Sequence, residues 1–199
     1  MTYTQWQEMC ATGLAPLQRS LITEEARDRL NRTWQPDIII GLLQTEAYAR
    51  AILSACIAVL DLPNDLEETV SARMERQRLL DEDGRSFRFL IGEAALWRTV
   101  GTPAVMAEQL ERLHDATANP RVSLGIVPLA AEYRAPANGF VIQDSRVVST
   151  ETVGGEIVSD QPADIALHEK TFEILENQAV YDAKAKDLIG KVRAFHLTR

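Results

Sequence analysis

The stretch Ser86-Phe87-Arg88-Phe89-Leu90-Ile91 decides the fold class. Its aromatic and β-branched residues alternate with neighbours of other character, which is the two-residue period of a β-strand. The residues before it, up to Gly84, instead repeat their apolar side chains every three or four positions, as helices do. A chain that changes from helical to strand periodicity in this way is typical of an α+β protein.

Upstream of this strand, the sequence predicts three helices. The first is expected over residues 4–33, the second from the N-cap Thr45 to Asp61, and the third from a capping box at Asn64 and Glu67 to Gly84. Downstream, short helices are expected at 93–100 and from Pro103, strands at 122–126, 140–142 and 147–153, and helices from Asp164 to the end, with a break near Tyr181.

These elements predict one domain over residues 1–199. It is expected to have an N-terminal helical arm (1–84), a strand-rich core (85–160) and C-terminal helices (161–199). The predicted fold class is α+β, with a small mixed or antiparallel sheet of about four strands packed with helices. No repeat, low-complexity tract or linker interrupts the sequence.

Composition narrows the possible partners. With 46% hydrophobic and 25% charged residues in a chain of 199, a single soluble domain is expected. The formal net charge of −8 repels a nucleic-acid backbone, so no direct nucleic-acid binding is expected. We also expect no membrane association and a cytoplasmic location, because the chain lacks an 18-residue apolar run and a signal peptide, and its two cysteines lack metal-type spacing.

Residues that commonly carry catalysis are sparse. The phosphate-binding, dinucleotide-binding and nucleophile-elbow motifs are all missing, and the three histidines lie far apart in the sequence. We therefore expect no metal and no cofactor. Glu93 and Glu151 are weak catalytic candidates, since the two carboxylates face each other if their strands are neighbours, although most such carboxylates are solvated surface charges.

Two further features suggest binding. The loop over residues 130–139 is longer than a hairpin turn, and its Tyr133 and Arg134 are candidates for a lid or contact surface. The arginines at 73, 76 and 78 can grip an acidic partner or a phosphate, or can form a solvated helix face that pairs with the glutamates at 67, 68 and 75.

Several ordered motifs resemble the DUF5753 family. The stretch Gly41-Leu42-Leu43-Gln44-Thr45-Glu46-Ala47-Tyr48-Ala49-Arg50 is similar to the family's Gly-Leu-Leu-Gln-Thr-x-x-Tyr-Ala-Arg signature. The segment Arg73–Leu80 resembles its Arg-x-x-Arg-Gln-x-x-Leu motif. Matching blocks follow at Glu93–Leu96, Val105–Leu110 and Val127-Pro128, so that the resemblance runs from about Trp6 to Ile189.

The resemblance implies a function in regulation. Members of this family are the C-terminal domains of actinobacterial XRE-type regulators, also called Scr1-family antitoxin-like regulators. It implies a module that senses a small molecule or binds a small protein of the DUF397 type, similar to BldB, and that can form a homodimer. Because the chain begins where the family's helix-turn-helix would have ended, it is expected to lack its own DNA-binding domain, either as an excised domain or as a free-standing member.

The motif segments supply the candidate residues for binding a ligand or partner. Besides Tyr133 and Arg134, these are Gln44, Tyr48, Arg76, Gln77, Glu93 and Gln109. The alternative for these polar residues is helix capping and structural hydrogen bonding. A different function also stays open: a free-standing copy recruited as a biosynthetic enzyme, with a carboxylate such as Glu93 or Glu151 as acid or base in a closed pocket.

Overall fold

The structure, a computed structural model, describes residues 1–134 and 138–199. Its strands are β1 (Thr2–Gln5), β2 (Leu30–Gln35), β3 (Ser86–Gly92), β4 (Val122–Val127), β5 (Phe140–Gln143), β6 (Val147–Glu151) and β7 (Gly155–Ser159). Its helices are α1 (Trp6–Met9), α2 (Ala15–Glu25), α3 (Glu46–Leu60), α4 (Leu66–Arg76), α5 (Ala94–Trp97), α6 (Pro103–Ala116), α7 (Pro162–Glu176) and α8 (Asp182–Leu197), with 3-10 turns at Gly41–Leu43 and Gln77–Asp81.

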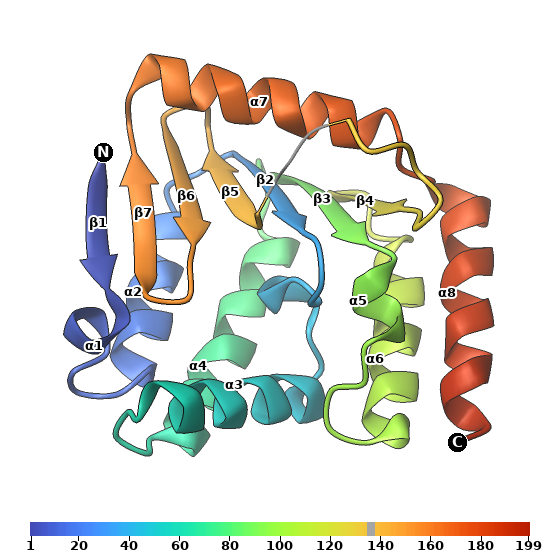
Figure 1. The fold of residues 1–199 in the computed structure, drawn as a ribbon, viewed down its shortest axis with the longest axis horizontal. Coiled ribbons are helices and arrows are strands. Elements are labelled where there is room, and N and C mark those ends of the chain that lie inside the picture. Colours follow the sequence, from blue (N-terminus) through green and yellow to red (C-terminus); the bar gives the residue numbers. More distant parts are fainter. Residues whose placement is uncertain (135–137) are drawn as a thin grey trace.

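All seven strands form one mixed sheet in the order β1-β7-β6-β5-β2-β3-β4 (Figure 1). Strands β2, β3 and β4 pair in parallel, and the remaining neighbours pair antiparallel. Helices α3 and α4 lie in the connection from β2 to β3, and α5 and α6 in that from β3 to β4. This arrangement agrees with the crossover helices that parallel strands require.

Helices cover both faces of the sheet. Alternate residues of β3, namely Phe87, Phe89 and Ile91, share one apolar core with helices α6 and α8, while Leu90 of the same strand belongs to a second core beneath α7. Figure 1 shows α7 running across the strands and α8 standing beside α6, with which it packs. The result is a three-layer α/β architecture.

The predicted α+β fold with about four strands and an N-terminal helical arm is wrong. Residues 4–33 were expected to form one helix, but they contribute the end of strand β1, the short helix α1, helix α2 and most of strand β2. Strand β7 was also missed. The inward positions of β2 are polar, because they face a cavity rather than an apolar core, so the alternation that identifies a strand is not visible there.

Other local predictions are confirmed. Thr45 caps α3 by accepting a hydrogen bond from the backbone of Tyr48, and Thr102 caps α6 in the same way from Val105. The predicted break near Tyr181 is the start of α8. No helix in the described part of the chain is long and apolar enough to cross a membrane.

Candidate ligand-binding cavity

A cavity in two chambers lies between the antiparallel half of the sheet and helices α2, α3 and α4. The inner chamber has a volume of about 320 Å³ and the outer chamber about 450 Å³, within the range of small-molecule sites. The residues that line both chambers lie where the two meet; they are Trp6, Leu17, Gln18, Glu25, Arg73, Arg76, Val141 and Glu151.

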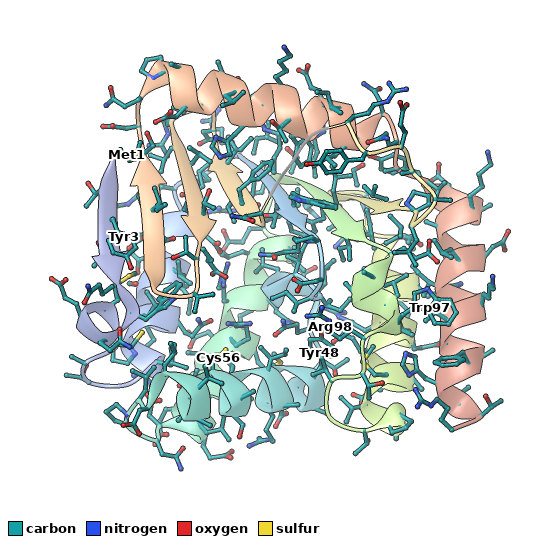
Figure 2. The ribbon with its side chains drawn as sticks, in the orientation of Figure 1. Met1, Tyr3, Tyr48, Cys56, Trp97 and Arg98 are labelled. Carbon is teal, nitrogen blue, oxygen red and sulfur yellow. The ribbon has the colours of Figure 1, made fainter. Side chains whose placement is uncertain are left out.

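The two walls of the inner chamber differ in chemistry. Its sheet wall carries Asn31, Thr33 and Gln35, which are alternate residues of β2. Its helical wall is mainly apolar and includes Ile52 and Cys56 of α3; Figure 2 shows Cys56 on this helix, far from Tyr48 near its start. A molecule with one polar and one apolar side matches this lining.

The N-terminal segment closes one side of the cavity. The indole of Trp6 lines both chambers, and its Nε1 donates a hydrogen bond of 2.9 Å to the carbonyl of Thr152. Strand β1, just before Trp6, pairs with β7 at the edge of the sheet. The segment is therefore held over the cavity by both backbone and side-chain hydrogen bonds.

Two arginines of α4 point toward α2. Arg73 donates from Nε to Gln18 (2.7 Å) and from Nη1 to Gln44 (2.8 Å). Arg76, one turn later, forms a two-bonded ion pair with Glu25, with a distance of 2.6 Å at Nε. Arg76 is thus neutralised within the protein, whereas the direct partners of Arg73 are neutral amides.

Removal from water and a neighbouring charge both lower the pKa of Arg73. Removal from water, together with the nearby positive charge of Arg76, lowers the pKa of the Arg73 guanidinium to about 10. The side chain stays charged at neutral pH, because that value is still well above 7. Gly41 makes room for it: a Cβ atom at Gly41 would lie 3.0 Å from Nη1 of Arg73.

Asp65 fixes the spacing between the two helices. Its carboxylate accepts hydrogen bonds from the backbone nitrogens of Leu14 (3.1 Å) and Ala15 (2.7 Å) at the start of α2, and from the hydroxyl of Thr69 (3.0 Å) in α4. One side chain therefore satisfies free N–H groups of α2 from the start of α4. By holding the start of α4 against the start of α2, Asp65 helps to place Arg73 opposite Gln18.

Asp65 gives a prediction of pH-dependent stability. Burial raises its pKa, but the hydrogen bonds from Ala15, Leu14 and Thr69 outweigh burial and leave the pKa below its usual value. Its stabilisation is therefore complete above the unfolded value of about 4 and is lost as the pH falls through the lower folded value. We expect Asp65→Asn to lower the free energy of unfolding by about 1–2 kcal/mol at pH 7, measured by urea denaturation.

The control for this prediction is Asp81→Asn, which changes an exposed aspartate. We expect it to have little effect at any pH. The difference between Asp65→Asn and the unmodified chain should shrink below about pH 4. A difference that stays constant down to pH 2 would contradict the assigned role of the carboxylate.

Gln44 and Tyr48, two predicted binding residues, hold the segment before α3. Gln44 donates to the carbonyl of Ile39 (2.8 Å) and accepts from Arg73, so it links the cavity to this segment. The hydroxyl of Tyr48 accepts from the backbone nitrogen of Ile39 (3.2 Å), and burial raises the pKa of Tyr48. Gln44 lines the inner chamber, but Tyr48 does not.

Gln77 and Gln109 hold the same segment from other sides. Gln77 donates to the carbonyl of Gln44 (2.6 Å). Gln109, which is completely buried, donates to the carbonyl of Leu43 (2.8 Å) and accepts from the backbone nitrogen of Thr45 (2.7 Å). Neither glutamine lines the cavity, and in this structure both stabilise backbone conformation.

Glu93 and Glu151 are not brought together. Glu93 follows β3, whereas Glu151 ends β6, and two strands separate β3 from β6 in the sheet. The carboxylate of Glu93 accepts from the indole of Trp97 (2.9 Å) and the backbone of Leu129 (2.8 Å). Glu151 is exposed, lines both chambers, and lies directly opposite Glu156 of β7.

Tyr133 and Arg134 do not line either chamber. Tyr133 is 80% exposed, and Arg134 pairs with Glu132 at 2.7 Å. Residues 135–137 of the same predicted loop lie outside the described residues. None of the described residues of this loop lines the cavity around Arg73, and its role as a lid or contact surface stays a prediction.

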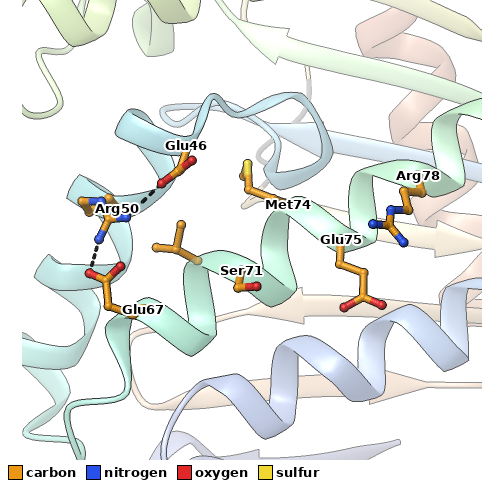
Figure 3. Close-up of a pocket in the computed structure, with 8 residues that line it drawn as sticks. Glu46, Arg50, Glu67, Ser71, Met74, Glu75 and Arg78 are labelled. Carbon is orange, nitrogen blue, oxygen red and sulfur yellow. Dashed lines mark hydrogen bonds and ion pairs between the residues drawn. The ribbon is translucent and has the colours of Figure 1, made fainter.

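A separate groove of about 440 Å³ lies between α3 and α4. Its Arg50 already pairs with Glu46 and Glu67, as the dashed lines in Figure 3 show, and all three side chains are exposed by more than a third. Arg78 and Glu75 continue this solvated face. We assign no site to the groove, because its charges are paired and open to water.

The sequence reasoning found only part of the cavity. Arg76 and Gln44 were binding candidates and line it, but Gln18 and Glu25 were not found, and Arg73 was left between a binding role and a solvated helix face. The polar residues Thr69, Arg73 and Arg76 of α4 repeat at helical spacing, and the two arginines contact Gln18 and Glu25, which are seven residues apart on α2. Two polar stripes at helical spacing, on helices that also carry apolar stripes, were a signal for a buried polar layer. No group of three or more metal-ligating side chains lies together among the residues described.

Comparison with solved structures finds folds of low sequence identity. NucT from Helicobacter pylori has a TM-score of 0.49 and 10% identity, with 91% of this chain and 98% of that chain covered. Nuc, a phospholipase D family member from Salmonella typhimurium, has a TM-score of 0.43 and 12% identity, covering 84% and 89%. TrmBL2, an archaeal chromatin protein, has a TM-score of 0.41 and 12% identity, covering 84% and 51%.

Comparison of the sequence with curated proteins and with protein families gives one match, to a family. No curated protein matches the chain. The model of a domain of unknown function, DUF5753, matches residues 18–191, which include most of α2, all of α4, the parallel strands and most of α8. The match covers most of the chain, and the protein therefore belongs to the DUF5753 family.

Proposed function

We propose that this chain is the ligand-sensing module of a bacterial transcriptional regulator and that it binds a small molecule in the cavity between the sheet and α2, α3 and α4. One observation carries the proposal: a cavity with one polar and one apolar wall lies where a domain of this size usually has a packed core. The two free cysteines are consistent with a reducing compartment such as the cytoplasm.

Gln44 connects the proposed ligand site to the segment before α3. This side chain contacts Arg73 in the cavity and the carbonyl of Ile39 in the segment before α3. The same segment is bonded to Gln109 of α6. A ligand that moves Arg73 would thus act on the position of α6, which packs against α8 near the surface.

The test is a thermal-shift screen of small metabolites with a variant that fills the cavity. Cys56→Phe places a ring in the inner chamber, and Ser54→Phe is the matched control, because Ser54 is exposed on the same helix. A ligand at a hundred times its Kd is expected to raise the melting temperature by about 5–10 °C. The shift should persist in Ser54→Phe and disappear in Cys56→Phe; a shift that survives Cys56→Phe would place binding elsewhere.

Acid–base catalysis on the bound molecule is a second candidate function. It is favoured by the pairing of Glu151 and Glu156 across β6 and β7. Burial raises the pKa of Glu156, and the negative charge of Glu151 raises it further, as in many general acids. Mass spectrometry of a ligand incubated with the protein distinguishes catalysis from sensing. A change in the mass of the ligand that Glu156→Gln abolishes supports catalysis. A ligand of unchanged mass supports sensing alone.

A further inference from the structure

Arg73 differs from the other arginines that the structure describes. Those at positions 32, 50, 76, 85, 88, 98, 121, 134, 146 and 193 pair with a carboxylate. Those at 19, 27, 29, 78, 112 and 199 have no carboxylate partner in these residues but are exposed to water. Arg73 alone among the described arginines is half-buried and has no carboxylate within 4 Å.

The unpaired guanidinium still has hydrogen-bond donors to offer. A guanidinium has five N–H groups, and the described partners, Gln18 at Nε and Gln44 at Nη1, use two of them. Both glutamines are nearly completely buried, so they fix the orientation of Arg73. The Nη1 and Nη2 atoms present the planar fork that binds a carboxylate through two parallel hydrogen bonds.

The charges around the cavity favour a ligand that carries a single negative charge. Arg76 is occupied by Glu25, and Arg27, which also lines the outer chamber, is exposed to water. Arg73 is therefore the one half-buried cation among the described lining residues that lacks a carboxylate partner. Glu151 and Glu156 line the outer chamber, and their negative charges would repel a phosphate dianion more strongly than a carboxylate. On the inner side, the apolar side chains of Leu17, Ile52 and Cys56 provide a site for an uncharged body.

We propose that the ligand of this cavity is a monocarboxylic acid with an apolar body, bound through its carboxylate by the fork of Arg73 with the body in the inner chamber. The inference rests on the proposed ligand-sensing function and adds the chemical class of the ligand. An arginine that is partly removed from water and lacks a counter-ion is costly to keep in a folded protein, and a bound carboxylate supplies that counter-ion.

Matched pairs of acids and amides test the charge requirement on the unmodified chain. Hexanoate, octanoate and phenylacetate are compared by isothermal titration with hexanamide, octanamide and phenylacetamide, and phenyl phosphate is included as the dianion. We expect at least one acid to bind about 10- to 100-fold more tightly than its amide and more tightly than phenyl phosphate. Equal binding of acids and amides, stronger binding of phenyl phosphate, or no binding by any acid would overturn the proposal.

Two variants locate the carboxylate. Arg73→Met is expected to reduce the affinity for the acid to that for the amide. Glu151→Gln is expected to strengthen binding of the acid several-fold, because it removes a competing negative charge from the lining of both chambers. An acid that binds Arg73→Met as tightly as the unmodified chain would refute the role of Arg73.

The outcomes separate this inference from the proposed function. A neutral molecule whose binding is lost in Cys56→Phe but kept in Arg73→Met would preserve the ligand-binding cavity and refute the carboxylate. An acid that binds through Arg73 but remains bound in Cys56→Phe would refute the placement of its body in the inner chamber. Loss of all binding in the Ser54→Phe control would refute the cavity assignment itself.

Discussion

Replacement of Arg76 by methionine is expected to lower the free energy of unfolding by about 3–5 kcal/mol. The variant leaves the carboxylate of Glu25, whose side chain is 7% exposed, without its positive partner inside the protein. An isolated buried charge is far more costly than the pair is stabilising. Chemical denaturation followed by circular dichroism measures the loss.

The chain offers a matched control for this prediction. Arg50 also pairs with glutamates, but these pairs are exposed, so Arg50→Met should cost less than about 1 kcal/mol. The double change of Arg76→Met with Glu25→Leu should recover most of the stability, because neither member of the pair is left without its partner. A loss in Arg76→Met no larger than that in Arg50→Met would show that Glu25 is not desolvated as the structure has it.

Replacement of Gln109 by leucine is expected to produce the second large loss in the free energy of unfolding. Its amide satisfies two backbone groups, the carbonyl of Leu43 and the nitrogen of Thr45. Each unsatisfied buried group costs about 1–3 kcal/mol. Denaturation should therefore show a loss several times that of Glu108→Leu, a change at the exposed neighbouring residue.

The Gln109→Leu variant also distinguishes the two interpretations of Gln109 that the sequence left open, ligand binding and structural hydrogen bonding. The structure places Gln109 outside the cavity. Folded Gln109→Leu should thus bind octanoate with an affinity close to that of the unmodified chain. Full stability together with lost binding would instead assign Gln109 to the ligand.

The sequence predicted elements whose inner faces are apolar. Strand β3 was recognised because Phe87, Phe89 and Ile91 all enter one core, and α3 and α6 were located by the threonine caps that precede them. These are local signals, which need no knowledge of the partner elements. They were sufficient for the parallel strands β3 and β4 and for most helices.

The cavity explains why strand β2 and the position of Arg73 were not predicted. On β2, Asn31 and Thr33 face the cavity while Trp34 faces the core beneath α7, so the strand shows no apolar alternation on its cavity side. On α4, Arg73 lies near glutamates in sequence, as in a solvated helix face. Its contact with Gln18, 55 positions away, comes from the packing of α4 on α2, which periodicity alone does not reveal.

The most direct test of the ligand-binding cavity is a crystal structure of the chain with the tightest-binding carboxylate of the acid series. We expect density for the acid between the sheet and α2, α3 and α4, with both carboxylate oxygens within hydrogen-bond distance of Arg73 and the apolar body beside Cys56. Density for the acid in the groove between α3 and α4, or an Arg73 that pairs with Glu151 while the acid lies elsewhere, would contradict the account.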